Sequence, residues 1–314
     1  MTTKTRGGHA GRWPARQRKL AGALALLLLG AAYWQAHTLS MPWQQPAEAL
    51  AAAAAQPAGA QQLAGYQASI QHRPIAGIVD NLSGLTYDAR SGMLFGVTNR
   101  PPAVVELSTE GQLLRSMPVR GVRDPEGIAH IRDDWFAIAD ERRNRIHWVQ
   151  IGPGQREVQT QQGPVLALGE ASIKNFGLEG LGWDSQRQQL LAVTEKWPLQ
   201  VLALDGPVLT PGARNLQLAT HPWESQDAAG VPSTDLASIE VDPRSGNLLL
   251  LGEESSVLYE YTRAGELLGL MPLWAGLSGL DESIGQPEGV AIDPAGTLYI
   301  VAEPNLFYRF EKRG

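Results

Sequence analysis

The sequence contains no cysteine, which excludes disulfide bonds, thiolate zinc sites and cysteine nucleophiles. It also lacks an HExxH zinc motif, a GxSxG nucleophile elbow, a GxxxxGK[ST] phosphate loop and an Asp-rich EF-hand loop. The usual sequence signatures of zinc peptidases, α/β-hydrolases, P-loop NTPases and helical calcium sensors are therefore missing.

Acidic residues are absent from the amino-terminal part of the chain, where the first is Glu48. Residues 1–19 hold six basic side chains, and an apolar stretch centred on residues 20–34 follows them. A basic flank of this kind stays in the cytoplasm, and the apolar stretch spans the bilayer if residues 35–41 join it. A cleaved signal peptide is the alternative, although Trp34 occupies the third position before a cut after Ala36.

We therefore divide the chain into four segments and favour an uncleaved anchor. These are a basic cytoplasmic segment (1–19), a transmembrane signal-anchor (20–41), an Ala-, Gln-, Gly- and Pro-containing linker (42–65) and an exported domain (66–314). This division predicts a single-pass protein of the inner (plasma) membrane with its domain in the periplasm.

Basic residues are scarce in the exported part of the chain. After residue 19 there are 20 basic residues against 32 acidic ones, with no basic run. Binding to nucleic acid depends on neutralising phosphates with Lys and Arg, so this composition argues against a nucleic-acid partner.

Five internal repeats organise the exported domain. Each begins with an apolar run, continues through a turn into a second run and adds a third; the first runs are LSGLTYD (82–88), PEGIAHI (125–131), LEGLGWD (178–184), LASIEVD (236–242) and PEGVAID (287–293). Short strands in units of about 40–60 residues are typical of β-propellers. The fold class predicted is therefore all-β, a five-bladed β-propeller of four-stranded blades, preceded by a transmembrane helix.

Two features complete this prediction. The last repeat stops after its third strand, so we expect YQASI (66–70) to supply the fourth strand and close the ring. Longer spacings place insertions near residues 150–175 and 205–235.

The order of motifs resembles a known family. PEGIAHIRDDWFAIADERRNRIHWV (125–149) looks like an NHL repeat, and the series from NRPPAVVELSTEG (99–111) to QPEGVAIDPAGTLYIVAEPNLFYRF (286–310) resembles the SdiA-regulated (YjiK-like) family. The resemblance covers about residues 66–311. It implies a membrane segment, a five-bladed propeller and a calcium site, but no established activity.

Carboxylates recur at matching places in the repeats. The first strands of propeller blades line the central channel, so we expect Glu126, Glu179 and Glu288 to converge there, with Ser83 and Ala237 in the other two sectors. Clustered carboxylates repel one another unless a cation intervenes, and Ca²⁺ accepts about 6–8 oxygen ligands. We predict a Ca²⁺ site; binding of backbone amides by these carboxylates is the alternative.

A second aligned set closes the second strand of each repeat, and we expect it farther from the axis. Its members are Asn99, Glu141, Glu195, Glu253 and Glu303. They are candidates for binding backbone amides or for pairing with Arg100, Arg142 or Lys196. Glu240, three positions beyond Ala237, is a further candidate metal ligand that would compensate for that alanine.

These patterns favour a binding module for a protein or a small ligand, because the acidic cluster comes without a nucleophile or a histidine base. A calcium-dependent hydrolase of the lactonase or esterase kind is the alternative, with Glu141, Glu195, Glu253 or Glu303 as the base. A scaffold in which calcium only ties the blades together is the third hypothesis.

Overall fold

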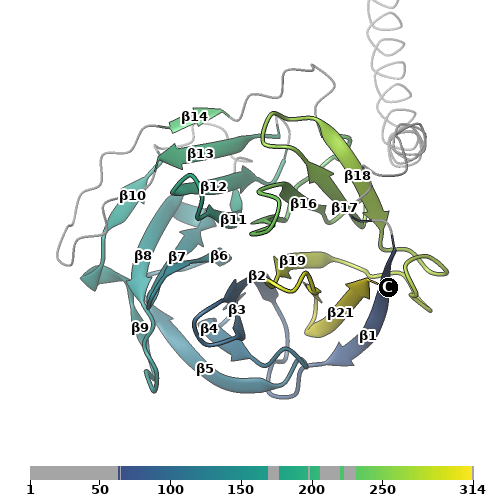
Figure 1. Cartoon of the computed structure of the whole chain (residues 1–314). Coiled ribbons are helices and arrows are strands. Elements are labelled where there is room, and N and C mark those ends of the chain that lie inside the picture. Colours follow the sequence, from purple (N-terminus) through teal and green to yellow (C-terminus); the bar gives the residue numbers. More distant parts are fainter. Residues whose placement is uncertain are drawn as a thin grey trace, which may run out of the picture. The chain divides into compact units, whose positions relative to one another are not determined.

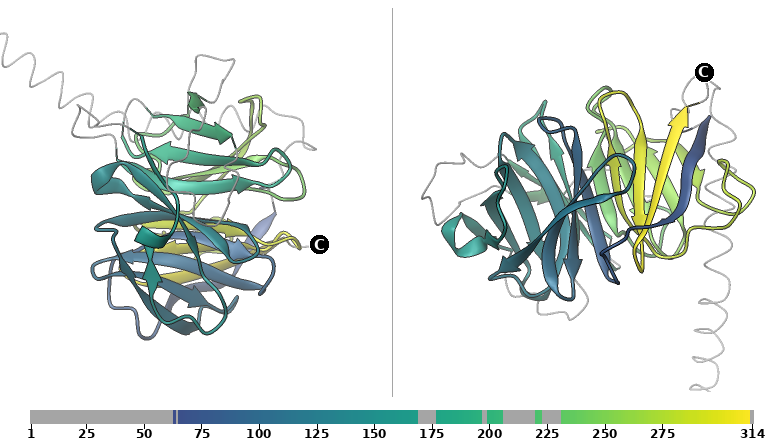
Figure 2. Two further views of the ribbon diagram at one scale, coloured as in Figure 1. Left: turned by 90° about the vertical axis from the view of Figure 1, so that its left-hand side faces the viewer. Right: turned by 90° about the horizontal axis from the view of Figure 1, so that it is seen from below.

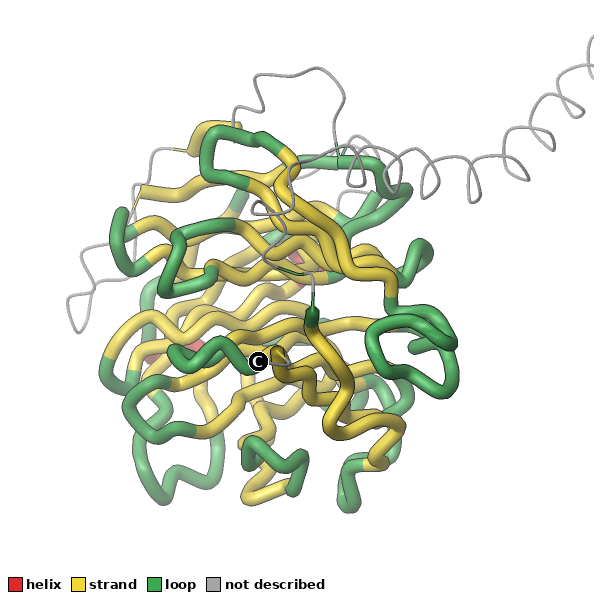
Figure 3. The backbone as a smooth tube through the Cα atoms, turned by 45° about the vertical axis from the view of Figure 1, so that its right-hand side comes forward, coloured by secondary structure: helices red, strands yellow, loops and turns green. Residues whose placement is uncertain are grey.

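Five sheets surround a common centre in the computed structural model, which describes residue 63 and residues 65–168, 177–196, 199–205, 220–222 and 231–312 (Figure 1). Strands account for nearly all the regular structure of these residues, and the only helices among them are two short 3-10 turns, Glu141–Arg143 and Thr160–Gln162 (Figure 3). The predicted five-bladed β-propeller is confirmed.

Each repeat forms one blade, with its first strand nearest the centre (Figure 1). Blade 1 contains β2 (Leu82–Asp88), β3 (Met93–Asn99), β4 (Pro102–Leu107) and β5 (Leu113–Arg120). Blade 2 contains β6 (Pro125–Arg132), β7 (Trp135–Asp140), β8 (Arg145–Gln150) and β10 (Val165–Ala167). Blade 3 contains β11 (Leu178–Asp184), β12 (Gln189–Thr194), β13 (Val201–Asp205) and β14 (Thr220–Pro222).

The remaining two blades follow the same plan. Blade 4 contains β15 (Ser238–Val241), β16 (Leu248–Gly252), β17 (Val257–Tyr261) and β18 (Leu267–Pro272). Blade 5 contains β19 (Pro287–Ile292), β20 (Leu298–Ala302), β21 (Leu306–Lys312) and β1 (Tyr66–Pro74). Figure 2 shows the strands of the blades from two sides.

Blade 5 closes the ring with strands from both ends of the domain. β1 pairs antiparallel with β21, from Tyr66 opposite Lys312 to Pro74 opposite Leu306. The strand expected at residues 66–70 is present and continues for four more residues. The Tyr66 hydroxyl donates a hydrogen bond of 2.5 Å to the Gly296 carbonyl, and Leu63, just before the strand, is also buried.

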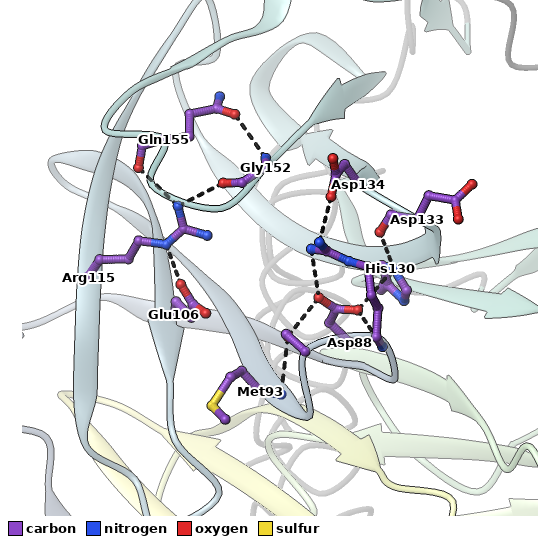
Figure 4. Close-up of polar contacts among 11 residues, drawn as sticks. Asp88, Met93, Glu106, Arg115, His130, Asp133, Asp134, Gly152 and Gln155 are labelled. Carbon is purple, nitrogen blue, oxygen red and sulfur yellow. Dashed lines mark hydrogen bonds and ion pairs between the residues drawn. The ribbon is translucent and has the colours of Figure 1, made fainter.

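Blade 1 departs from the four-stranded prediction because it gains a fifth strand. Residues of the first insertion return from blade 2, and β9 (Val158–Gln159) pairs parallel with the end of β5. Arg115 of β5 fastens this segment, since its guanidinium forms an ion pair with Glu106 and donates to the carbonyls of Gly152 and Gln155 (Figure 4).

The core is divided among the blade interfaces. Five clusters of buried apolar side chains are present in the described residues, and each joins the facing sides of two neighbouring blades. Between blades 1 and 2, for example, the rings of Phe95 and Phe136 lie 4.8 Å apart and both side chains are buried. Because every blade is covered on both faces, its strands are almost continuously apolar.

Aspartates at the ends of first strands organise the hairpin turns. Asp88 is fully buried, and its Oδ1 accepts a 2.9 Å hydrogen bond from the backbone N–H of Arg90, as expected for an Asp that caps its own turn. Its carboxylate also lies 3.3 Å from His130 Nε2 of blade 2 (Figure 4). The Arg90 side chain forms an ion pair with Asp134. Asp88 therefore serves the turn and the contact between blades.

Among the described residues, no helix has the length and apolar character needed to cross a bilayer. The signal-anchor predicted at residues 20–41 lies outside the described residues.

Candidate functional site

The starts of the five first strands meet at one cavity of about 160 Å³. Its lining includes all five residues of the first aligned set: Ser83, Glu126, Glu179, Ala237 and Glu288. Each blade contributes one of them, so three carboxylates from blades 2, 3 and 5 face a shared space.

Small residues explain why the first strands approach so closely. Each residue of the first set is followed directly by a small residue. The five small residues are Gly84, Gly127, Gly180, Ser238 and Gly289. A Cβ added to Gly84 would lie 2.6 Å from the Glu126 carbonyl oxygen, and one added to Gly289 would lie 2.7 Å from the Gly84 carbonyl carbon. Neighbouring strands thus touch backbone to backbone, and the preceding side chains converge.

The second aligned set is tied to the first by a repeated hydrogen bond. In every blade, the backbone N–H of the second-set residue donates a hydrogen bond. The acceptor is always the residue that stands two positions before the first-set residue of the same blade. These bonds are Asn99 to Asn81 O (3.3 Å), Glu141 to Asp124 O (3.0 Å), Glu195 to Gly177 O (3.0 Å), Glu253 to Asp235 Oδ2 (3.0 Å) and Glu303 to Gln286 O (3.0 Å).

This hydrogen bond brings the second set to the cavity. We expected the set farther from the axis, yet four of its five members line the same cavity, namely Asn99, Glu195, Glu253 and Glu303. Glu141, the fifth, offers a carboxylate oxygen within 4.8 Å of oxygens of Glu179 and Glu195. The two sets therefore form one site.

Two further carboxylates belong to this site and were missed from the sequence. Asp235 is 1% exposed, lines the cavity and accepts hydrogen bonds from the backbone N–H groups of Glu253 and Glu254. Asp124 groups with Glu126 and Glu141, with carboxylate oxygens within 4.8 Å of one another. Both lie two positions before a first-set residue, so aligning the repeats at that position could have identified them.

The structure places Glu240, the further candidate ligand, away from the cavity lining. It lies within β15, is not among the residues lining the cavity, and its Oε1 accepts a 2.8 Å hydrogen bond from the Val241 backbone N–H. Burial raises the pKa of its carboxyl to about 8. Asp235, not Glu240, supplies the carboxylate of blade 4 next to Ala237.

Burial and mutual repulsion raise the pKa values of the cavity carboxyls. The pKa of Glu126 rises to about 7, chiefly through desolvation, although Asn99 and Ser83 hydrogen-bond to it. Desolvation, followed by the charges of Glu253 and Glu303, raises the pKa of Glu288 to about 9. The pKa of Glu179 is raised by desolvation and then by Glu126 and other acids. Without a counter-ion the cavity cannot hold all its carboxylates ionised at neutral pH.

Basic side chains at the edge of the site are partly engaged with these acids. Lys196 Nζ lies 3.1 Å from carboxylate oxygens of both Glu195 and Glu254. Arg142 pairs with Asp124 at 3.1 Å, although the sequence suggested pairing with the second set. No ion pair within the described residues involves Arg100, which is exposed beside Asn99.

Comparison with known proteins supports the family resemblance. The family model described as SdiA-regulated matches residues 58–311. Among solved structures, the glutaminyl cyclase of Myxococcus xanthus superposes with a TM-score of 0.56 at 15% identity, covering 78% of this chain and 95% of that one.

A second solved structure is less similar. The gluconolactonase of Xanthomonas campestris gives a TM-score of 0.46 at 17% identity over 74% of this chain and 72% of that one. At these identities, the similarity to the cyclase shows a shared propeller fold and nothing about chemistry.

Proposed function

This chain belongs to the SdiA-regulated family, and we propose that it is a binding module whose central cavity holds a divalent cation, Ca²⁺, as part of a ligand site. The observation that carries this proposal is the convergence of carboxylates from four of the five blades on one cavity. The proposed location is the periplasmic face of the inner membrane, with residues 20–41 as the anchor.

The donor chemistry of the cavity fits calcium. Its lining offers carboxylate, amide and hydroxyl oxygens and contains neither histidine nor cysteine, a composition suited to a hard cation. Asn99 Oδ1 is buried without a hydrogen-bond partner, whereas Asn99 Nδ2 donates to Glu126 Oε1 at 2.8 Å. An unpaired buried oxygen beside a carboxylate cluster is a position that a cation would satisfy.

Two groups of carboxylates have ligand oxygens close enough to share a cation. They are Asp124, Glu126 and Glu141 in one group and Glu141, Glu179 and Glu195 in the other. Glu288 faces the same cavity from blade 5. Bound calcium would supply positive charge that stabilises these carboxylates in their ionised form.

The absence of an activated nucleophile from the cavity lining favours binding over catalysis. Ser83, the only hydroxyl side chain in the lining, hydrogen-bonds to Glu126, which has no histidine relay behind it in the described part of the chain. A calcium-dependent hydrolase is the second candidate, because the pKa of Glu141 is raised by desolvation and by Asp124 and Glu195, as a general base requires.

Calorimetric titration with Ca²⁺ tests the cation site. We expect Glu126→Gln combined with Glu288→Gln to weaken binding by at least about tenfold, since buried charged ligands are lost. Glu240→Gln is the matched control, because Glu240 lies outside the cavity lining and should leave the affinity unchanged. Unaltered affinity in the double variant would remove the cavity as the calcium site.

The same preparation separates binding from hydrolysis. With calcium restored to a chelator-treated sample, we expect no turnover of simple lactones or esters. Turnover that Glu141→Gln abolishes, without loss of calcium, would replace the binding module with the hydrolase.

A further inference from the structure

Lys196 brings a positive charge directly to the cavity. Its Nζ lies 3.1 Å from Oε1 of Glu195, a residue of the cavity lining, and 3.1 Å from Oε1 of Glu254, which is not part of that lining. The Lys196 side chain is 33% exposed, so the ammonium lies at the border between the cavity and solvent. One ammonium therefore bridges a carboxylate of the candidate calcium site and a carboxylate outside it.

Lys196 and Glu254 occupy the same repeated position in neighbouring blades. Lys196 directly follows the second-set residue of blade 3, and Glu254 directly follows that of blade 4. The equivalent residue of blade 2, Arg142, pairs with Asp124 of its own blade instead. Blade 3 therefore differs from blade 2 in that its basic side chain joins a lining carboxylate to the next blade.

Glu254 is held in place for this pairing. Its other carboxylate oxygen, Oε2, accepts a hydrogen bond from the Thr234 hydroxyl, and its backbone N–H donates to the Asp235 carboxylate at 3.1 Å. Lys196 itself forms an isolated β-bridge with Asp235. These contacts fix Glu254 independently of Glu195, so the ammonium keeps one carboxylate partner when a metal ion takes the other.

The ammonium stays charged in this setting. Burial alone would lower the pKa of Lys196, but hydrogen bonds to Glu254 and Glu195 outweigh this effect and raise it. A positive charge held at 3.1 Å from a carboxylate oxygen repels a metal ion that binds the same carboxylate. Glu195 has a carboxylate oxygen close to those of Glu141 and Glu179, so this repulsion acts at one of the two groups that can share a cation.

We propose that Lys196 is a tethered competitor of calcium, which holds Glu195 in the calcium-free protein, pairs with Glu254 alone when the cation binds, and so lowers the calcium affinity of the site. This inference rests on the proposed calcium site and adds a means of regulating it. A purely structural clasp between blades 3 and 4 is the alternative. Loss of a clasp would weaken calcium binding or leave it unchanged, but would not strengthen it.

Calorimetric titration of Ca²⁺ into the Lys196→Met variant tests this role. We expect the variant to bind calcium at least about threefold more tightly than the unaltered protein, because the repulsion between ammonium and cation is removed. Lys196→Arg keeps the charge and should retain the lower affinity. Arg120→Gln is the matched control for loss of one positive charge, since Arg120 is exposed on the outer strand of blade 1, where it pairs with Glu157. It should leave the affinity unchanged.

Glu254→Gln should change the affinity in the opposite direction. Without its outer partner the ammonium is left with Glu195, so calcium affinity should fall by at least about threefold, although Glu254 is not a lining residue. Part of this fall comes from the loss of a negative charge near the site, and the double variant Lys196→Met/Glu254→Gln separates the two effects. Glu254→Gln should cost less affinity in the Lys196→Met background than in the unaltered protein.

The charge of the probe ion provides a second readout. Repulsion by the ammonium grows with the charge of the cation, so Lys196→Met should strengthen the binding of Tb³⁺ by a larger factor than that of Ca²⁺. Loss of a structural clasp would not favour the ion of higher charge.

The outcomes separate this inference from the proposed function. Calcium binding that Lys196→Met weakens or leaves unchanged overturns the competitor role and leaves the calcium module standing. Absence of calcium binding in the unaltered protein overturns the calcium module, and this inference with it. If Lys196→Met does not fold, Lys196→Gln takes its place with the same expectations.

Discussion

At the scale of single residues, the cavity depends on small side chains as much as on acidic ones. The repeat alignment identified the carboxylates of blades 2, 3 and 5 because they occupy one repeated position. It missed Asp235. In the other blades a backbone carbonyl accepts the hydrogen bond from the second-set N–H, whereas in blade 4 the Asp235 carboxylate accepts it. Hydrophobic periodicity cannot reveal that a side chain has replaced a backbone group as acceptor.

Gly127→Ala should destabilise the protein strongly. The added methyl would collide with the Glu179 carbonyl oxygen and lie 3.0 Å from the Leu181 nitrogen, both of which are backbone atoms. Overpacking of this kind costs about 1–3 kcal/mol, and denaturant unfolding measures it. Gly285→Ala, with nothing within 4 Å of the new methyl, is the control. Equal losses in both variants would contradict the close backbone approach.

At the scale of elements, the strands of each repeat follow from alternating and continuous apolar runs and from turn residues such as Asp88. The exception is β9, a two-residue parallel pairing formed by an insertion. So short a strand has no periodicity to detect, and only its contacts with blade 1 create it. Ring closure was predictable because the last repeat lacks a strand.

Removal of β1 should abolish stable folding. A chain that begins after Pro74 leaves the edge of β21 unpaired and uncovers the buried ring of Tyr308. We expect loss of the cooperative thermal transition and aggregation through the free edge. A milder change, Tyr66→Phe, removes only the hydrogen bond to Gly296 and should cost about 1 kcal/mol. A soluble, cooperatively melting truncated chain would show that four-stranded closure is dispensable.

At the scale of the whole molecule, the excess of acidic residues after residue 19 is concentrated at one place. Nine carboxylates of blades 2 to 5 lie in or beside one cavity: Asp124, Glu126, Glu141, Glu179, Glu195, Asp235, Glu253, Glu288 and Glu303. Composition alone could only argue against a nucleic-acid partner. These carboxylates meet because the five blades form a ring. The spacing of the repeats predicts the ring, but its dimensions depend on contacts between the strands.

Calcium binding should release protons, since raised pKa values mean that the cation competes with protonation. A carboxyl with a raised folded pKa binds more protons in the folded chain than in the unfolded one, so stability falls as pH rises. For the calcium-free protein, this loss begins near pH 4.5 and continues to the pKa of Glu126, about 7, and that of Glu288, about 9.

Two measurements check this coupling. The melting temperature of the chelated protein should fall between about pH 5 and about pH 9, and calcium should restore most of the loss. Calorimetric heats of calcium binding at neutral pH should change with the ionisation enthalpy of the buffer. Buffer-independent heats would mean that the acids are already ionised when calcium arrives.

The closure of blade 5 also sets the order of events during synthesis. β1 is the first strand of the domain to be made, but its partner β21 is among the last, and the Tyr66 hydroxyl finds the Gly296 carbonyl 230 residues later. The first strand must therefore wait unpaired while four blades are completed. Contacts so distant along the chain make folding slow, and the interval before closure is when this chain most needs protection from association with other chains.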